Sequence, residues 1–152
     1  MIGSSGPSDN IRASRQQGCA LSDKLIQIES FTPYEIVGKP WGTELIVAET
    51  KDYLGKVLTM RAGHRGGLQY HERKDEAFYL YRGHATVVYV DELGQLARKI
   101  MTAGQTFHIP PGAVHQVIAM TDCVFLECST PVFDDRINVS DKYGVGEAGL
   151  SQ

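Results

Sequence analysis

The sequence lacks any long apolar run, although 42% of its 152 residues are hydrophobic. A membrane-spanning helix needs about 20 consecutive apolar residues, so we expect no membrane partner. An excess of one charge is also missing, since 15 basic and 18 acidic residues leave a formal net charge of −3. Such a small negative charge gives no broad attraction to nucleic acid, and we expect none as a partner.

Cysteine is scarce, with only Cys19, Cys123 and Cys128 in the chain. Three scattered cysteines cannot form a disulfide framework. Cys123 and Cys128 are five positions apart in a strand-like run, which places them on opposite faces of a strand. We therefore expect reduced structural thiols and no cysteine metal site.

The first 18 residues contain no apolar segment of the kind found at the centre of a secretory signal, so we expect a cytoplasmic protein. Residues 1–22 are rich in Gly, Ser, Gln and charged residues and predict a flexible N-terminal arm. Residues 22–30 fit a short helix or an edge strand. We expect one domain over residues 23–144 and a flexible, Gly-rich tail over residues 145–152.

Short runs rich in β-branched and aromatic residues recur from Glu44 onward, separated by Gly, Pro and Asp. This pattern predicts an antiparallel sandwich or barrel, and not alternating strands and helices. The sequence DELG at residues 91–94 fits a hairpin turn between two runs. The predicted strands lie within residues 44–50, 55–62, 67–71, 76–83, 85–92, 95–103, 106–110, 114–120 and 123–131.

Three side chains that could bind a metal lie within a short stretch, at Gln69, His71 and Glu76. Gln69 and His71 are two apart, so both side chains point to one face of a strand. Residues 72–75 are charged and predict an exposed turn. Glu76 shares its strand face with apolar residues, and a buried carboxylate is costly unless it is paired or bound to a cation. These residues suggest a metal site, to which His115 could add a fourth ligand.

The spacing around these residues resembles the two sequence motifs of the cupin superfamily. Residues 63–83 follow the first motif, with Gln69 in place of its first His. Residues 104–119 follow the second motif, with His115 in place and Ala119 where an Asn is usual. The resemblance implies an all-β fold, a cupin-type double-stranded β-helix or jelly-roll barrel, in a single domain.

A narrower resemblance, over about residues 36–144, is to small stand-alone cupins related to the C-terminal domain of type II mannose-6-phosphate isomerases. The matching segments are residues 38–44, 68–76, 108–115, 129–131 and 134–144. The resemblance implies that Gln69, His71, Glu76 and His115 are the metal ligands. It also implies an isomerase or epimerase that acts on a sugar or sugar phosphate.

Two positions depart from that family, which tends to carry Arg where this sequence has Gln116 and Asn138. The guanidinium group of Arg binds phosphate through two parallel hydrogen bonds, so the absence of both arginines weakens the expectation of a phosphorylated substrate. A neutral Gln69 amide leaves Glu76 as the one anionic ligand, and the cation keeps charge with which to polarise a sugar carbonyl or hydroxyl. Mixed O and N ligands suit one divalent ion, Zn²⁺ first and then Mn²⁺, Co²⁺, Ni²⁺ or Fe²⁺.

An aldose–ketose isomerisation needs a cation that stabilises an enediolate and a base that moves a proton. His64, Lys74 and Lys56 are open candidates for the catalytic base. Arg65 and Trp41 are candidates for substrate binding, and Trp41 is also a candidate for plain packing.

Two other functions stay open at this point. The chain could be a non-catalytic cupin that binds metal or sugar, or an Fe-dependent oxygenase or lyase, because the fold hosts many chemistries. Open sheets leave edges that a second copy can pair or cover. We therefore expect a homodimer, with residues 22–35 crossing to the partner subunit, and a small-molecule substrate.

Overall fold

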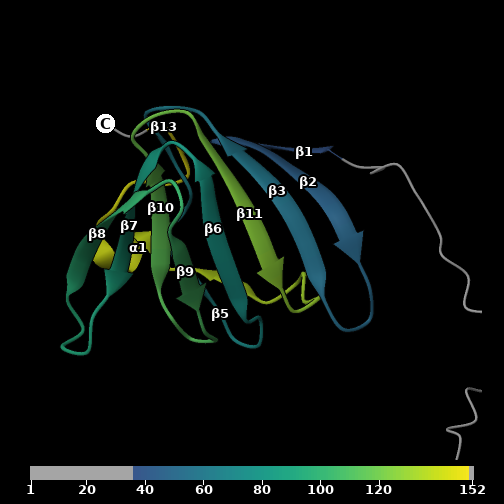
Figure 1. The fold of residues 1–152 in the computed structure, drawn as a ribbon. Coiled ribbons are helices and arrows are strands. Elements are labelled where there is room, and N and C mark those ends of the chain that lie inside the picture. Colours follow the sequence, from purple (N-terminus) through teal and green to yellow (C-terminus); the bar gives the residue numbers. More distant parts are fainter. Residues whose placement is uncertain (1–35, 151–152) are drawn as a thin grey trace, which may run out of the picture. The chain divides into compact units, whose positions relative to one another are not determined.

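The structure is a computed structural model that describes residues 36–150 (Figure 1). The predicted arm of residues 1–22, the segment 22–35 expected to cross to a partner, and Cys19 lie outside the described residues. Strands dominate the described chain. The elements are β1 Ile36–Lys39, β2 Gly42–Glu49, β3 Leu54–Met60, β4 His64–Arg65, β5 Gln69–His71, β6 Glu76–Arg82, β7 His84–Val90, β8 Leu96–Thr102, β9 Thr106–Ile109, β10 His115–Ala119, β11 Cys123–Ser129, β12 Arg136–Asn138, α1 Ser140–Tyr143 and β13 Gly149–Leu150.

The strands form two antiparallel sheets. The six-stranded sheet has the order β1-β2-β3-β11-β6-β9, and its strands form one curved layer in Figure 1. The seven-stranded sheet has the order β12-β5-β10-β4-β13, with β7 beside β10 and β8 beside β7. Across residues 36–150 the four-residue α1 is the one helix. The prediction of an all-β jelly-roll barrel of antiparallel strands is confirmed.

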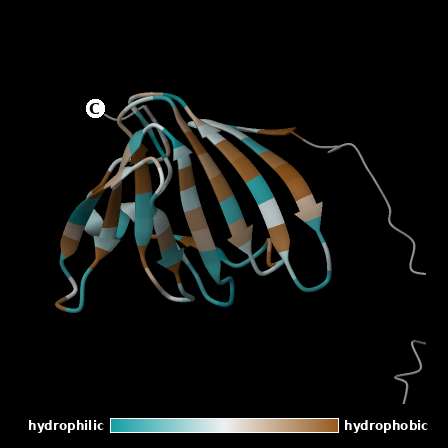
Figure 2. Cartoon of the chain, in the orientation of Figure 1, coloured by the Kyte–Doolittle hydropathy of each residue, from teal (hydrophilic) through white to brown (hydrophobic). Residues whose placement is uncertain are grey.

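Regular alternation of side chains explains why β3, β6 and β11 form strands. Every second side chain of these strands is buried, as the two-residue period of a strand requires, and Figure 2 shows bands of alternating hydropathy along them. The inward-facing residues are Leu54, Lys56, Leu58 and Met60 of β3, Glu76, Phe78 and Leu80 of β6, and Cys123, Phe125, Glu127 and Ser129 of β11. The register places Met60, Leu58, Phe125 and Leu80 toward one end of this inner face and the charged Lys56, Glu127 and Glu76 toward the other, where Leu54 is also buried.

The apolar end holds the hydrophobic core. Phe125 is only 2% exposed and packs edge to face against Phe78, with the ring centroids 6.4 Å apart. Leu80 of the same sheet and Val87 and Met101 of the other sheet are buried with them. Burial of each such side chain contributes about 1.5–3 kcal/mol to the free energy of folding. This contribution can offset the cost of burying charged side chains at the other end of the barrel.

The residues of the β7–β8 turn and of the β6–β7 turn explain the conformations of these two turns. In the β7–β8 hairpin the amide of Gly94 donates to the carbonyl of Asp91, and the carboxylate of Asp91 accepts the amides of Leu93 and Gln95. The predicted hairpin at residues 91–94 is therefore confirmed. Gly83 turns the chain from β6 to β7 with φ of 101°, and a Cβ there would lie 2.5 Å from the carbonyl oxygen of Asp122. Only glycine fits this close approach.

Four short strands escaped the sequence analysis. The strands β1, β4, β12 and β13 are only two to four residues long, too short to show a period of two. Within the predicted tail of residues 145–152, β13 pairs with β4 in the register Gly149 to Arg65 and Leu150 to His64.

The two described cysteines are both free, Cys123 buried and Cys128 exposed. The prediction that they occupy opposite faces of one strand is confirmed, because both belong to β11. Within residues 36–150, no helix is long and apolar enough to cross a membrane.

Candidate functional site

A cavity of about 640 Å³ opens at the charged end of the inner face and is lined by residues of both sheets. The four predicted ligands Gln69, His71, Glu76 and His115 all line it. Gln69 and His71 come from β5, Glu76 from the first position of β6, and His115 from the first position of β10. The fold therefore brings together side chains that are up to 46 positions apart in the sequence (115 minus 69).

One oxygen of Glu76 is the meeting point of the two histidines. The Nε2 atom of His115 lies 3.2 Å from Glu76 Oε1, and the Nε2 atom of His71 lies 3.7 Å from the same oxygen. Glu76 is 2% exposed, yet its Oε1 has no hydrogen-bond partner. A buried acceptor without a donor is rare in folded proteins and calls for an explanation.

The tautomers of the histidines supply that explanation. The Nδ1 atom of His115 lies 3.0 Å from the carbonyl oxygen of Ala113, and the Nδ1 atom of His71 lies 2.8 Å from the carboxylate of Asp135. Each Nδ1 must therefore carry a proton, because its partner can only accept. In the neutral rings Nε2 then presents a lone pair, so three acceptors converge on one point.

These distances fit a shared cation. Two ligands about 2.0–2.2 Å from one metal ion are about 3.0–3.5 Å apart at octahedral or tetrahedral angles. The separations of 3.2 and 3.7 Å from Glu76 Oε1 lie close to that range. Across residues 36–150 no three His, Cys, Asp or Glu side chains lie together as a group that could hold a metal ion.

Gln69, the fourth predicted ligand, lines the same cavity from the strand position paired with His115. Its Cα is the cross-strand partner of the His115 Cα, so the two side chains share one face of the sheet. The Gln69 amide lines the cavity, and none of the side-chain hydrogen bonds found among the described residues involves it. Its carbonyl oxygen is therefore free to turn toward the point where the other three acceptors meet.

The charges and hydrogen bonds around Glu76 and Asp135 keep both carboxylates ionised. Burial raises the pKa of Glu76, but His115 in its protonated form and the ammonium group of Lys74 outweigh burial and lower the pKa to about 2 when no metal ion is bound. Burial also raises the pKa of Asp135, but donation from the amides of Arg73 and Lys74 and from His71 lowers it to about 2. Asp135 thus holds the ring of His71 as a charged acceptor.

Lys74 departs from the expected exposed turn of residues 72–75. Glu72 and Arg73 are exposed, but Lys74 is buried and turns inward. Its Nζ atom lies 2.8 Å from Glu76 Oε2 and 2.6 Å from Glu127 Oε1. Burial lowers the pKa of Lys74, but the charges of Glu127 and Glu76 outweigh it and raise the pKa above its ordinary value. Lys74 is therefore held as an ammonium ion.

A chain of alternating charges continues from Lys74 along the cavity wall. Beyond Glu127, the Nζ atom of Lys56 lies 3.8 Å from Glu127 Oε2 and 3.4 Å from Glu44 Oε2, and Lys39 lies 3.6 Å from Glu44. Glu127 was missed in the sequence, although it shares a strand face with apolar residues just as Glu76 does. The partners Lys56 and Lys74 come from other strands, which no local pattern identifies.

The remaining predicted residues divide into two groups. Lys56, Lys74 and Trp41 line the cavity, and Trp41 also packs against the core, so both interpretations of this residue fit its position. His64 and Arg65 do not line it. They belong to β4, where His64 Nδ1 lies 3.0 Å from the carbonyl of Ala62 and Arg65 donates to the carbonyl of Glu147.

The two positions that depart from the isomerase family hold backbone and the chain end in place. Gln116 is buried, and its side-chain amide donates to the carbonyl oxygens of Gly66 and Gly146. The Asn138 side chain donates to Glu147 and accepts the amide of Ser140. Both side chains also line the cavity.

The comparison with known families agrees with the fold. Residues 56–128 match the family model described as the cupin domain, a segment that runs from β3 to β11. The chain therefore contains a cupin domain. No curated protein sequence matches the chain.

Solved structures share the fold at low sequence identity. The capsular polysaccharide assembling protein CapF from Staphylococcus aureus is 18% identical, with 72% of this chain and 32% of that chain covered and a TM-score of 0.64. Oxalate decarboxylase from Bacillus subtilis, described with Mn(II) centres, is 19% identical over 72% of this chain and 31% of that chain, with a TM-score of 0.61. KdgF from Halomonas sp. is 24% identical over 66% of this chain and 89% of that chain, with a TM-score of 0.57. The chain spans about a third of the length of CapF and of the decarboxylase, and these likenesses establish the fold alone.

Proposed function

We propose that this chain, whose residues 56–128 form a cupin domain, is a metal-dependent isomerase or epimerase acting on a sugar or sugar phosphate. The observation that carries the proposal is the convergence of His71 Nε2, His115 Nε2 and the unpartnered Glu76 Oε1 in a cavity. With both histidines neutral, three acceptors of this kind can share one cation. Gln69 completes the proposed ligand set.

The donor set fits one divalent ion, Zn²⁺ first and then Mn²⁺, Co²⁺, Ni²⁺ or Fe²⁺. When bound, such an ion would act as a Lewis acid that polarises a carbonyl or hydroxyl oxygen. The surrounding residues set the tautomers of the two histidine ligands and the hydrogen bonding of the Glu76 carboxylate. Asp135 and the Ala113 carbonyl fix the two imidazole tautomers, and Lys74 occupies Glu76 Oε2 so that Oε1 stays available.

The cavity suits a sugar-sized ligand. Its volume of about 640 Å³ lies in the range of small-molecule sites. One part of the lining is aromatic, with Trp41 and Phe133, and another part is the charged chain that includes Lys56 and Glu127. A sugar has apolar C–H faces and a rim of hydroxyls, and this lining offers partners to both.

Proton transfer needs a group inside the cavity. Lys56 and Lys74 remain candidates because both line it, whereas His64 does not. Each lysine is held in ion pairs with carboxylates, so the ligand would have to displace one of those contacts before a lysine could act as a base.

The test combines metal analysis with a turnover assay. The purified chain is loaded with each of the five ions, and bound metal is measured by elemental analysis. Aldose–ketose interconversion is then followed by NMR on free and phosphorylated aldoses, with and without a chelator. We expect stoichiometric metal and a turnover that stops on chelation. Metal-loaded protein that turns over none of these substrates would contradict the isomerase proposal.

A second candidate function is a non-catalytic cupin that binds metal and sugar. The raised pKa of Lys74 favours it, because an ammonium ion held by two carboxylates is a poor base near neutral pH. Saturable sugar binding without turnover would identify this function. The third candidate, an Fe-dependent oxygenase or lyase, predicts oxygen consumption or elimination products with ferrous iron.

We also propose that the chain forms a homodimer in the cytoplasm. The outer face of the six-stranded sheet supports the dimer, since paired positions carry Ile36, Leu45, Val57, Leu126 and Tyr79 in one cross-strand row. Ile36 is 70% exposed and Leu126 39% exposed. A contiguous apolar row of this kind is a usual site of association.

A further inference from the structure

The cationic side chains of the cavity differ in one respect. Lys39, Lys56 and Lys74 are each ion-paired with a glutamate of the cavity wall. Arg136 also lines the cavity, but none of the ion pairs or hydrogen bonds found in the described part of the chain involves its guanidinium group. Arg136 is therefore the cavity's uncompensated cation within residues 36–150.

The sheet register places Arg136 beside the proposed metal site. In the pairing of β12 with β5, Arg136 lies opposite His71 and Asn138 lies opposite Gln69. Directly paired residues of antiparallel strands point to the same face, with Cβ atoms about 4.5–5.5 Å apart. The Arg136 side chain therefore starts next to a proposed ligand and ends at the solvent-exposed rim.

The acidic groups near Arg136 in the sequence are engaged elsewhere. Asp134 accepts from the guanidinium of Arg73 at 2.9 Å, and Asp135 accepts from His71. Glu147 accepts from the side chain of Asn138 at 2.9 Å. The rim of the cavity thus keeps a guanidinium fork, which binds carboxylate or phosphate through two parallel hydrogen bonds.

We propose that Arg136 binds the anionic group of the ligand, so that the substrate class is an acidic sugar, carboxylated or phosphorylated, whose neutral oxygens reach the metal site. This inference rests on the proposed function. It gives the chain an anion-binding residue although the arginines of the isomerase family are replaced by Gln116 and Asn138. Arg136 occupies a different position, two residues before Asn138 on the same strand face.

The test uses three probes with one ring and different charge: D-glucose, D-glucuronate and D-glucose 6-phosphate. Each is titrated calorimetrically into the Zn²⁺-loaded full chain. We expect at least one charged probe to bind about 10–100-fold more tightly than glucose, as charge-assisted hydrogen bonds allow. Tighter binding of D-glucuronate would indicate a carboxylate site, and tighter binding of D-glucose 6-phosphate would indicate a phosphate site.

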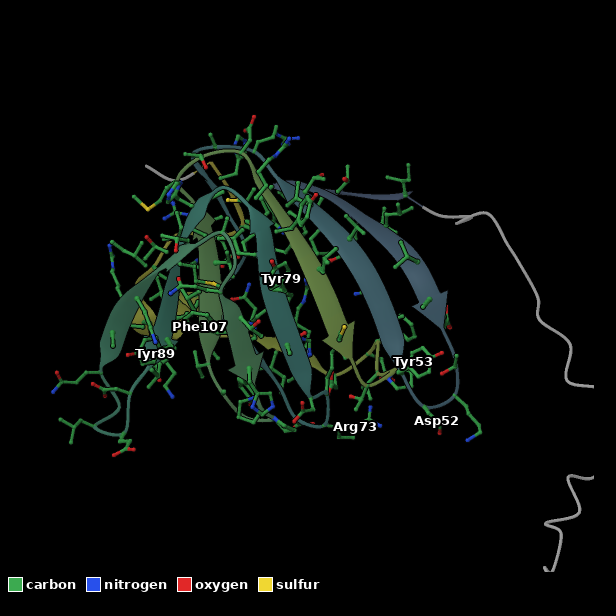
Figure 3. All side chains as sticks on the ribbon, viewed as in Figure 1. Asp52, Tyr53, Arg73, Tyr79, Tyr89 and Phe107 are labelled. Atoms are coloured by element: carbon green, nitrogen blue, oxygen red, sulfur yellow. The ribbon has the colours of Figure 1, made fainter. Side chains whose placement is uncertain are left out.

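Variants of Arg136 then test whether this residue causes the preference for a charged probe. Arg136→Gln is expected to abolish the preference for the charged probe and to leave glucose binding unchanged. Arg136→Lys should keep part of the preference, because it retains the charge but loses the fork. The matched control is Arg73→Gln, which removes the same charge from a side chain that is 64% exposed, does not line the cavity and projects from the lower edge of the molecule in Figure 3.

Three results would overturn the inference: equal affinity for all three probes, no binding of either charged probe, or equal losses in Arg136→Gln and Arg73→Gln. The Zn²⁺ content of each sample distinguishes failure of the Arg136 inference from failure of the proposed function. If wild-type protein holds Zn²⁺ and converts sugars but binds all three probes equally, only the Arg136 inference is wrong. Wild-type protein without bound metal removes the proposed function.

Discussion

At the scale of single residues, the carboxylate of Glu76 is the centre of the site. Its Oε2 pairs with Lys74, while its Oε1 faces two imidazole nitrogens without a proton between them. A protein tolerates a buried acceptor of this kind when a cation binds there. Predictions at this scale therefore concern metal affinity.

Glu76→Gln should lower metal affinity by more than about 100-fold, because loss of a direct ligand exceeds the 10–100-fold cost of losing an outer partner. The change removes the one anionic ligand of the proposed set and nearly preserves shape. Elemental analysis and calorimetric titration with Zn²⁺ would measure it. Glu72→Gln is the control, since Glu72 is exposed in the preceding turn. Unchanged metal content in both Glu76→Gln and His115→Ala would show that the site is wrongly assigned.

Gln69→His should keep or raise metal affinity, because imidazole is the stronger ligand for late first-row cations. The same change should lower turnover, since a stronger donor reduces the Lewis acidity of the ion and can occupy a substrate position. Gln69→Ala should weaken metal binding by only about 10-fold, because a neutral amide is a weak ligand and its loss costs no more than that of an outer partner. Bound metal and turnover are measured on the same samples. A Gln69→His variant with weaker metal binding would argue against ligation by this residue.

At the scale of elements, Asp135 joins the segment before β12 to the turn between β5 and β6. One of its oxygens accepts the amides of Arg73 and Lys74 at 2.7 and 2.9 Å, and the other accepts from His71. The carboxylate satisfies the donors of that turn and orients a proposed ligand at the same time. This connection depends on the negative charge of Asp135.

The pKa of Asp135 predicts how this connection responds to acid. The folded pKa of about 2 lies below the ordinary value of 3.8, so the charge stabilises the fold above about pH 3.8. That contribution is lost as the pH falls from about 3.8 to about 2. Urea unfolding of the metal-free chain should therefore show a smaller loss of stability over this interval in Asp135→Asn than in the wild type. Parallel losses in the two proteins would contradict the assignment.

At the scale of the whole molecule, the outer face of the six-stranded sheet bears the apolar row from Ile36 to Tyr79. Figure 3 shows Tyr79 on β6, beside β11. The inner face of the same sheet is filled by the core and the cavity, so the row remains as surface that a second copy can cover.

We expect light scattering to give a dimer mass that dissociates on dilution. Leu126→Lys should shift the equilibrium toward monomer by at least about 10-fold, because it places a charge in the middle of the apolar row. Leu93→Lys is the control, since Leu93 is 80% exposed in the β7–β8 hairpin and belongs to no such row. A monomer mass at all concentrations in the wild type would exclude the homodimer.

The sequence by itself determined the features that depend on local spacing. Alternation along β3, β6 and β11 needs only a period of two, and the two motifs place Gln69 and His71 two residues apart on one strand. The inward position of Glu76 follows from the same period. The all-β class could therefore be predicted before any strand was paired, and the resemblance to the cupin motifs added His115 to the proposed ligands.

Only the tertiary structure decided the features that depend on which strands are neighbours. Glu127 meets Lys74 and Lys56 because β11 lies between β3 and β6, and Arg136 faces the site because it is paired with His71. Arg65 is four residues from Gln69, yet its strand β4 pairs with β10 and β13 and does not line the cavity. The reason is physical: the register of antiparallel strands is set by contacts between residues far apart in the sequence, which no local pattern records.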